Sequence, residues 1–431
     1  MSEINDWVKL DNAGKIYPAA RRRNWMMMFR LSATLKEEID PEVLVLAQER
    51  VLKRLPYFAY RLRHGMFWYY MERTDSAPPV EWDVNNPCVP MQGRGNGFCF
   101  RVRWYERRIA VEFYHVLTDG AGGMVFLKTL VAEYLRLKYG ADIPRDDTIL
   151  DCDAPPRKEE MEDSFLAHAG EFTLSRSEVD SYQLRGEKDR LRLVNVITGI
   201  MPGEEIRARA KALGVTVTEY LTAVMLLSVD AIQRRHVRER RHMMLVKISV
   251  PVNLRALFPS KTVRNFSSYV NPGFDPRLGE YTMEEVAQLV HHFMRSEVTA
   301  KTLNAKFTTN VKSEQNGLLR AVPLFLKNPV MRMVFNAVGD RKYALSFSNL
   351  GNVVLPQKMA CFIERIEFLL GPMPKNKVGC ACAGYEGKLF INFTRTMIPA
   401  ELEREFFTRL VKLGVPVKIE SNRRDTDGLL R

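Results

Sequence analysis

The sequence has no hydrophobic run of 18 or more residues, the length that a helix needs to cross a membrane. The closest candidate, residues 221–232, is shorter than this and contains Asp230. The first residues also lack the basic head and the apolar stretch of a secretory signal. We therefore expect no membrane span, no export signal and a cytoplasmic protein.

Cysteine is sparse, with six residues, and none has the paired spacing of a zinc site. Cys380 and Cys382 are two apart, so both lie on one face if they are in a strand, and core packing is favoured over metal ligation. We predict no metal. No serine or cysteine stands in a G-x-S-x-G setting, which argues against a covalent acyl-enzyme, and no P-loop or paired dinucleotide fingerprint occurs.

The chain does have an excess of positive charge. Its 64 Lys and Arg against 51 Asp and Glu give a net charge of +13, with basic clusters at 21–23, 234–242 and 423–424. Such charge attracts nucleic acid, membrane phosphates, a nucleotide-bearing cofactor or an acidic carrier protein. No nucleic-acid-binding motif accompanies it, so we expect no nucleic-acid partner. A solvated basic surface is the simplest interpretation.

The length of 431 residues, with 46% hydrophobic and 27% charged residues, is typical of a globular chain of two domains. In the first 150 residues, Asp40 and Pro41 predict the start of a helix whose apolar stripe runs from Leu44 to Leu55. Strands are predicted at 24–31, 66–71, 98–104 and 109–115, and an amphipathic helix at 124–139.

Residues 141–190 are charged and proline-containing and lack a sustained period, and we place a crossover linker at 151–190. The sequence thus predicts an α+β architecture with an N-terminal lobe, 1–150, and a C-terminal lobe, 191–431. Strands of the second lobe are predicted at 191–201, 243–250, 343–348, 363–370, 378–383 and 389–393, and helices at 218–234, at 283–301 and after Pro399.

His115 is the strongest candidate for a functional residue. Ile109, Val111 and Phe113 share one face of the strand 109–115. A period of two puts His115 on the same face, at the carboxyl end. Three glycines within 119–123 predict tight turns there, with room for a ligand to approach closely. The alternative for a lone histidine on an apolar face is a hydrogen-bonded core residue.

The segment from His115 through Asp119 to Gly120 resembles the His-x-x-x-Asp-Gly signature of the chloramphenicol acetyltransferase-like superfamily. That superfamily includes alcohol acyltransferases, plant-type hydroxycinnamoyl transferases and condensation domains of nonribosomal peptide synthetases. Residues 250–255 and 264–266 resemble the segment in which an arginine pairs with the motif aspartate. The resemblance extends from about residue 20 to 400, and includes 346–351, similar to the channel strand at the lobe interface, and 23–25 and 55–58, similar to the bacterial alcohol-acetyltransferase-like branch.

The sequence departs from two other branches of this superfamily. Tyr114 precedes the motif histidine, where peptide-forming condensation domains commonly have a second histidine. Residues 348–351, Ser-Asn-Leu-Gly, stand where the plant enzymes have Asp-Phe-Gly-Trp-Gly. Both departures favour a stand-alone ester- or amide-forming enzyme. The resemblance implies two acetyltransferase-like lobes, each a mixed sheet with helices, and an active-site tunnel between them.

The resemblance also implies roles for single residues. His115 would be the general base that takes the acceptor's proton and returns it to the departing thiolate, a task that suits an imidazole with a pKa of about 6.5. Asp119 would pair with Arg255 and fix the loop that carries His115, and Gly120 would serve backbone geometry. An exposed turn aspartate is the alternative for Asp119. Candidate oxyanion donors or channel residues, equally plausible as polar strand-end residues, are Ser348 and Asn349.

We therefore predict an acyltransferase that moves an acyl group from acyl-CoA to a small-molecule hydroxyl, or less readily an amine, with no permanently bound cofactor. Two alternatives stay open. An acidic acyl carrier protein presenting a phosphopantetheine thioester would make the chain a condensation-type acyltransferase of secondary metabolism or lipid synthesis. A catalytically inactive relative would bind a metabolite or partner only.

Overall fold

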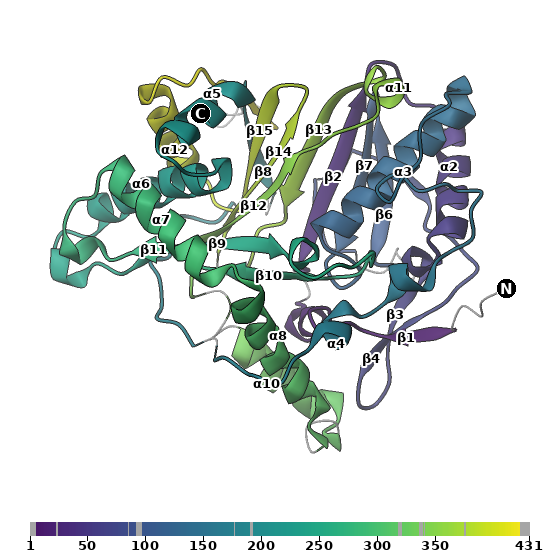
Figure 1. Cartoon of the computed structure of the whole chain (residues 1–431), viewed down its shortest axis with the longest axis horizontal. Helices are drawn as coiled ribbons and strands as arrows, with labels where there is room; N and C mark the ends of the chain where they lie inside the picture. Colours follow the sequence, from purple (N-terminus) through teal and green to yellow (C-terminus); the bar gives the residue numbers. More distant parts are fainter. Residues whose placement is uncertain are drawn as a thin grey trace.

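A computed structural model of the chain shows a two-lobed α+β fold in which each lobe is built on a mixed sheet covered by helices (Figure 1). The predicted fold class is confirmed. Some predicted features, among them residues 23–24, 191–192 and 423–424, lie outside the described residues. The residues described are 6–22, 25–84, 86–91, 97–175, 177–189, 193–317, 321–335, 339, 341–374 and 376–422.

The sheet of the first lobe has the strand order β13-β2-β7-β6-β5. It is mixed because β5 runs parallel to β6, while the other neighbours are antiparallel. Two helices, α2 and α3, lie beside this sheet (Figure 1). The bounds are β2 Met28–Leu35, α2 Pro41–Arg54, β5 Val80–Trp82, β6 Phe100–Tyr105, β7 Arg108–Tyr114, α3 Gly120–Tyr139 and β13 Ile363–Leu370.

Helix α2 begins where the sequence predicts. The Asp40 side chain accepts hydrogen bonds from the backbone N–H groups of Glu42 and Val43, which would otherwise lack partners in the first helical turn. The predicted apolar stripe from Leu44 to Leu55 is buried. Capping and helical periodicity together therefore fix this element.

The sheet of the second lobe has the order β10-β9-β12-β14-β15-β8-β16, with β11 also paired to β9. Helices α5, α6, α7 and α12 lie together on its outer side (Figure 1). The bounds are β8 Asn195–Pro202, α5 Gly203–Ala212, α6 Val217–His236, β9 Val246–Asn253, β10 Ser267–Val270, β11 Gly273–Phe274, α7 Met283–Glu297, β12 Leu345–Asn352, β14 Val378–Tyr385, β15 Lys388–Arg395, α12 Glu401–Lys412 and β16 Lys418–Ser421.

One strand from the second half of the chain completes the sheet of the first lobe. The predicted strand at 363–370 exists with those bounds as β13, and it pairs antiparallel with β2, Leu370 opposite Phe29 and Ile363 opposite Leu35. The period of a strand reveals which side chains are buried but not which strand lies beside it. The two lobes are therefore interlocked by β13 as well as by the crossover segment.

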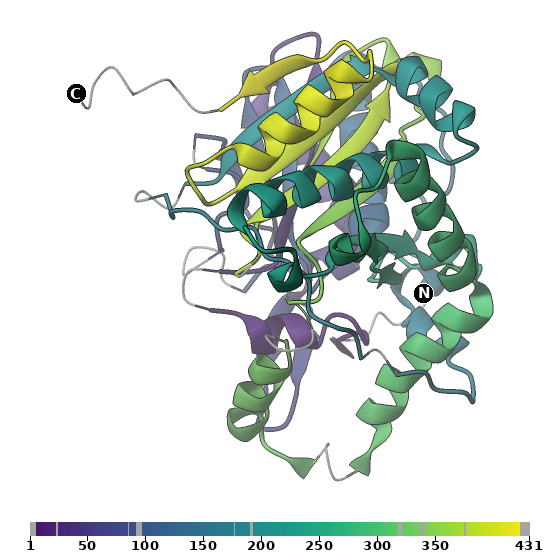
Figure 2. The ribbon, with the colours of Figure 1, turned by 90° about the vertical axis from the view of Figure 1, so that its left-hand side faces the viewer.

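A smaller sheet, β1-β4-β3, lies at one end of the molecule near α1, α8 and α10 (Figures 1 and 2). The sequence predicted a single helix at 283–301, whereas α7 ends at Glu297 and a separate helix follows. Helix α10 was not predicted, since it contains Pro329 and its apolar residues do not face the core. The bounds are β1 Trp7–Lys9, α1 Ile16–Ala20, β3 Arg61–His64, β4 Tyr69–Glu72, α8 Ala300–Gln315 and α10 Leu324–Val334.

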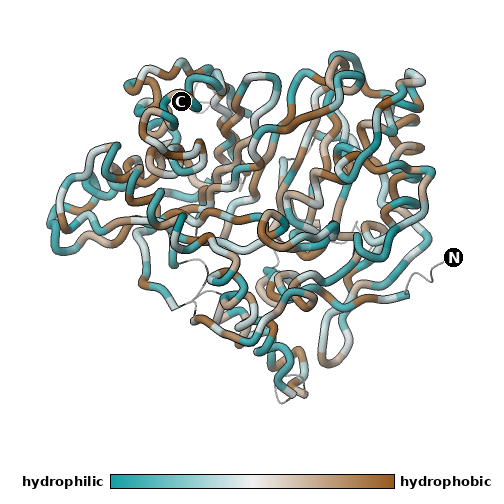
Figure 3. The backbone as a smooth tube through the Cα atoms, viewed as in Figure 1, coloured by the Kyte–Doolittle hydropathy of each residue, from teal (hydrophilic) through white to brown (hydrophobic). Residues whose placement is uncertain are grey.

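The strands carry much of the apolar sequence, which appears as brown stretches in both lobes (Figure 3). Cys380 and Cys382 on β14 are fully buried in the core of the second lobe. Among the described residues, no cluster of His, Cys, Asp or Glu has the make-up of a metal site. No single described helix has both the length and the apolar character of a membrane span, and α5 with α6 would reach it only across an 85° bend.

Candidate active site

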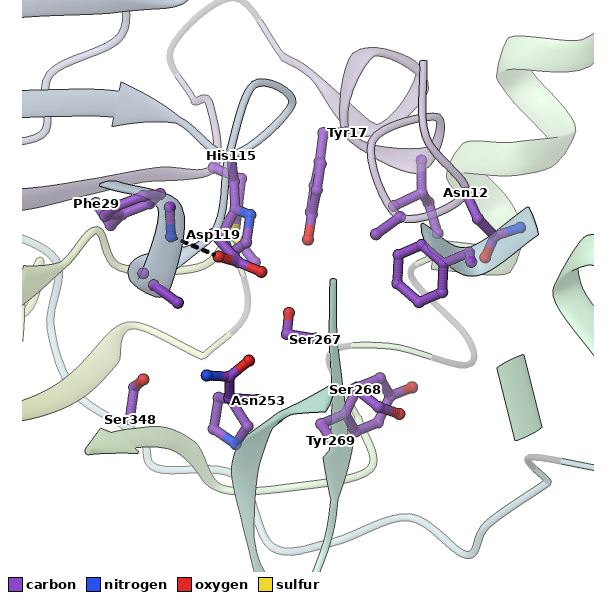
Figure 4. Close-up of a pocket in the computed structure, with 18 of the residues that line it drawn as sticks. Asn12, Tyr17, Phe29, His115, Asp119, Asn253, Ser267, Ser268, Tyr269 and Ser348 are labelled. Carbon is purple, nitrogen blue, oxygen red and sulfur yellow. Dashed lines mark hydrogen bonds between the residues drawn. The ribbon is translucent and has the colours of Figure 1, made fainter. Parts of the chain in front are cut away.

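A cavity of about 1390 Å³ lies between the two lobes and receives side chains from both. The first lobe contributes His115 and the amino end of α3, and the second contributes Asn253, Ser267 and Ser348 (Figure 4). Pockets for a single small molecule usually measure about 300–1,000 Å³. The volume is therefore large enough for two substrates to meet.

His115 follows directly after the last residue of β7 and lines this cavity. Its backbone N–H donates to the carbonyl of Met27 at 2.8 Å. Its ring packs against Tyr17, with centroids 4.9 Å apart, and edge-on against Phe29 at 5.3 Å. The imidazole is thus held on two sides by aromatic rings and open on the side of the cavity (Figure 4).

The hydrogen bonds of Asn265 assign the proton on the His115 ring. The amide nitrogen of Asn265 donates to Asp11 Oδ2 at 3.2 Å and to the carbonyl of Val116 at 3.5 Å, and both partners are acceptors. The amide oxygen therefore faces His115 Nδ1, at 3.0 Å, and needs a proton there. This leaves Nε2 as the unprotonated nitrogen of a neutral ring.

Burial lowers the pKa of His115 below its usual value, because the protonated ring would lose hydration. The charge of Asp119, the backbone carbonyl of His115 itself and Asn265 oppose this effect only in part. A lowered pKa favours the neutral form of the ring at pH 7.

The Asp119 carboxylate joins the two lobes. Its Oδ2 accepts from Arg255 Nη1 at 2.8 Å and from the backbone N–H of Phe266 at 2.7 Å. Its Oδ1 accepts from the backbone N–H of Gly122 and so caps the amino end of α3. Burial alone would raise the pKa of Asp119, but these partners, Arg255 above all, hold it below its usual range. The ion pair expected from the resemblance is present, and it is largely buried.

Arg255 also organises the segment that follows it. Its remaining guanidinium nitrogens donate to the carbonyls of Thr262, at 2.9 Å, and Arg264, at 2.6 Å. These bonds fold residues 255–266 into a compact loop, and the same loop brings Asn265 to the His115 ring. One arginine thus fixes both the aspartate and the residue that selects the tautomer.

The glycines after Asp119 do not form the turns that the sequence predicted. Residues 120–123 are the first turn of α3, because Asp119 caps the helix four residues earlier than expected. A Cβ on Gly122 would lie 2.1 Å from the carbonyl oxygen of Val263 and 2.4 Å from Thr118 Oγ1. Gly122 therefore lets the two lobes approach closely, and at Gly120 a Cβ would meet Leu350 at 3.2 Å.

Ser348 and Asn349 both line the cavity. The Asn349 amide donates to Thr218 Oγ1 at 3.0 Å and accepts from the backbone N–H of Gly351 at 2.7 Å, so it is engaged within its own lobe. Ser348 lies across the cavity from His115 (Figure 4). Of the two candidates, Ser348 is the one whose hydroxyl is better placed to meet a ligand.

Sequence reasoning missed two residues of the site. Tyr17 and Asp11 come from the N-terminal segment, where no pattern linked them to His115. Burial raises the pKa of Asp11 to about 6, in spite of the nearby Arg264 and of hydrogen bonds from Gly14 and Asn265. The resemblance includes Asn265 within the segment 264–266 but implies no role for it.

No family model matches the sequence, and no curated protein matches it either. Solved structures do. Polyketide synthase associated protein 5 from Mycobacterium tuberculosis aligns over 94% of this chain and 97% of its own, with a TM-score of 0.61 and 15% identity. The first condensation domain of the calcium-dependent antibiotic synthetase aligns over 94% and 96%, with a TM-score of 0.62 and 14% identity.

F. graminearum TRI101, solved with ethyl coenzyme A, aligns over 95% of this chain and 99% of its own, with a TM-score of 0.63 and 10% identity. At such identities the likeness establishes the fold and leaves the chemistry to the site. The chain has the two-lobed fold shared by condensation domains and TRI101.

Proposed function

We propose that the protein is an acyltransferase that moves an acyl group from a coenzyme A thioester to a hydroxyl group. The observation that carries the proposal is the place of His115, which lines a large cavity between the lobes with its Nδ1 3.0 Å from the Asn265 amide oxygen. A neutral ring that donates from Nδ1 to this oxygen keeps Nε2 as an acceptor. The fold supports it, because TRI101 was solved with coenzyme A.

The chemistry follows from that ring. Nε2 accepts the proton of the acceptor hydroxyl while the oxygen bonds to the thioester carbonyl carbon. The resulting tetrahedral oxyanion needs a hydrogen-bond donor, for which the Ser348 hydroxyl is our candidate. The carbon–sulfur bond then breaks, and the departing thiolate takes the proton back from Nε2, so the base is regenerated.

Asp119 acts as a positioning residue in this proposal. Its Oδ2 accepts from Arg255 and Phe266 and its Oδ1 from Gly122, so its hydrogen bonds in the structure go to the protein itself. Its role is to hold the loop 255–266 and the amino end of α3 in fixed positions around His115.

Coenzyme A as the donor is supported by two observations. F. graminearum TRI101 and a starter condensation domain of rhizomide synthetase were solved with coenzyme A derivatives. In the present chain Lys128 and Lys261 line the cavity, where cations would meet the phosphates of such a donor. An amine acceptor is less suited than a hydroxyl, because an ammonium group would be desolvated beside Tyr17 and Phe29.

A thiol-release assay of acyl-CoAs against pooled alcohols and amines tests the proposal. The wild-type chain should release thiol only with a matching acceptor, and His115→Ala should lower turnover by about 10²–10⁴-fold, the usual contribution of a positioned base. His242→Ala is the matched control, because that ring is exposed and does not line the cavity. Full activity of a folded His115→Ala variant would overturn the mechanism.

The same assay separates the alternatives. Replacing acyl-CoA with acyl carrier protein thioesters tests the condensation-type reading, for which activity would appear with the carrier alone. Absence of turnover with every thioester would favour a binding protein.

A further inference from the structure

The end of the molecule formed by α10 and the β3–β4 hairpin exposes apolar side chains. We call the six residues on it the apolar tip. Phe325 and Met333 are each 72% exposed and Met66 is 68% exposed. A monomeric protein rarely exposes a contiguous apolar patch without a use for it. The other members of the apolar tip are Trp68, Leu326 and Val330, all more than half exposed.

Helix α10 has two faces of different character. At 100° per residue, Phe325, Met333, Leu326 and Val330 fall within an arc of about 140° on the outer side. The opposite side lines the cavity with Leu324, Lys327, Asn328 and Met331. The outer apolar arc is therefore not part of the core and not part of the cavity.

The helix is attached to the hairpin, so the apolar tip is one surface. The backbone N–H of Leu324 donates to the carbonyl of Met66 at 2.8 Å, and Lys327 Nζ donates to the carbonyl of Phe67 at 3.0 Å. The Asn328 amide donates to the Tyr69 hydroxyl at 2.8 Å. Both elements stand at the same end of the molecule, away from the two large sheets (Figures 1 and 2).

Cations outnumber carboxylates around the apolar tip, where Glu72 at the end of β4 pairs with Arg63. Residues 12–35, 61–71 and 321–335 contain arginines and lysines but no Asp or Glu. Arg332 flanks the apolar arc on one side and Lys327 on the other, and Arg332 donates to the carbonyl of Arg21, which is itself exposed. An apolar face with Trp and Phe, flanked by cations, is the composition of a surface that lies in the interface of an anionic bilayer.

We propose that the apolar tip docks on an anionic lipid membrane, with Phe325, Met333 and Met66 entering the headgroup boundary. The cations beside it contact lipid phosphates while their stems lie along the apolar face. Because Trp68, Leu324 and Met331 line the cavity next to the apolar tip, docking brings this mouth of the cavity to the lipid.

A consequence for the substrate rests on the function proposed above. A cavity mouth held at the bilayer admits an apolar alcohol or a long acyl chain directly from the membrane, without passage through water. The substrate class that fits is a lipid-soluble alcohol, acylated at the membrane surface.

Vesicle co-sedimentation of the full chain tests the docking without any thioester. Vesicles of phosphatidylcholine with phosphatidylglycerol should retain the protein, vesicles of phosphatidylcholine alone should retain much less, and high salt should weaken retention. Phe325→Ser with Met333→Ser should lower the partition coefficient at least about tenfold, because two deeply inserted side chains are lost. Neither residue lines the cavity, so turnover of a water-soluble substrate should not change.

Val179→Ser with Leu278→Ser is the matched control, since both side chains are as exposed as those of the apolar tip but lie elsewhere. It should bind vesicles as the wild type does. Equal binding by the apolar-tip variant and the wild type, or no preference for the anionic lipid, would overturn the proposal. So would a wild-type dimer that the apolar-tip variant converts to monomer with vesicle binding unchanged, because the apolar tip would then be a contact between copies. If the double variant does not fold, Met333→Ser alone and the salt dependence of the wild type decide the question.

Acyl transfer and docking can fail separately. A wild-type protein that turns over soluble substrates but does not bind the anionic vesicles would refute the docking alone. Normal vesicle binding with no turnover would refute the proposed function alone.

Discussion

The two ends of the cavity are built by opposite means. Around His115, buried polar groups from both lobes satisfy one another: Arg255 donates to Asp119, and Asn265 bonds the His115 ring and Asp11. At the apolar tip, α10 is attached to its neighbours by a few partly buried hydrogen bonds, and the apolar side chains of its outer face are more than half exposed. The two regions therefore differ in rigidity. A fully hydrogen-bonded polar network holds the His115 side chain in a fixed position, whereas a helix with few contacts can adjust its position when it binds a partner.

Breaking the network at Arg255 should have the largest effect. Arg255→Ala would leave the buried Asp119 carboxylate without its cation and would release the loop 255–266. Removal of one partner of a buried pair typically costs about 3–5 kcal/mol in the free energy of unfolding, and turnover should fall with it. Arg277→Ala is the control, because its pair with Asp275 is exposed and such pairs contribute about 0–1 kcal/mol. Urea denaturation measures both, and equal destabilisation by the two variants would contradict a special role for Arg255.

Gly122→Ala tests the close contact between the two lobes beside His115. The added methyl would overlap the carbonyl of Val263, which cannot move without its loop, so we expect a loss of about 1–3 kcal/mol, as is usual for overpacking. The lobes would separate slightly at His115, and turnover should fall more than stability alone explains. Gly317→Ala is the control, since a Cβ there has no neighbour within 4 Å. Thermal melting and thiol release compare the two, and a Gly122→Ala variant that matches Gly317→Ala would refute the close approach.

Local signals in the sequence predicted most elements of the fold. The cap at Asp40, the alternation in β6 and β7 and the helical period of α6 depend on near neighbours in the chain, and each element is present close to its expected position. Strand partners depend on contacts over hundreds of residues. The pairing of β13 with β2 was therefore not predictable from local pattern, although its bounds were.

The residues of the site also fall into two groups, those that the sequence indicates and those that only the fold brings together. His115 stood out because it follows a buried strand, and the pair of Asp119 with Arg255 came from the resemblance. Asp11 and Asn265 lie 254 positions apart in the sequence and meet only because the chain folds back on itself. The glycines after Asp119 are turn signals by local pattern, but Gly122 leaves space for the carbonyl of Val263, a contact that no local pattern encodes.

Asp11→Asn should have the smallest effect, and it tests whether the polar network selects the tautomer of His115. Asp11 offers two acceptors, one to the backbone N–H of Gly14 and one to the Asn265 amide. An asparagine there has one acceptor and one donor. If its oxygen stays with Gly14, its NH₂ group faces Asn265, the Asn265 amide turns over, and the His115 proton moves to Nε2, where it blocks the base. The two arrangements differ in free energy by about the contribution of one hydrogen bond, so activity at pH 7 should fall about tenfold.

The pH profile of kcat/KM sharpens this test. The wild type should lose activity as the pH falls through the pKa of His115, which lies below 6.5, and protonation of Asp11, whose pKa burial raises to about 6, should add a second proton to the same limb. Arg264, Asp163 and Glu314 also lie near Asp11. Arg264 favours its ionisation and the two carboxylates oppose it, and all three stay in place in either protein. Asp11→Asn removes one of the two protons, so its acid limb should follow a single ionisation. Limbs of equal steepness in the two proteins would show that Asp11 does not act on His115 through Asn265.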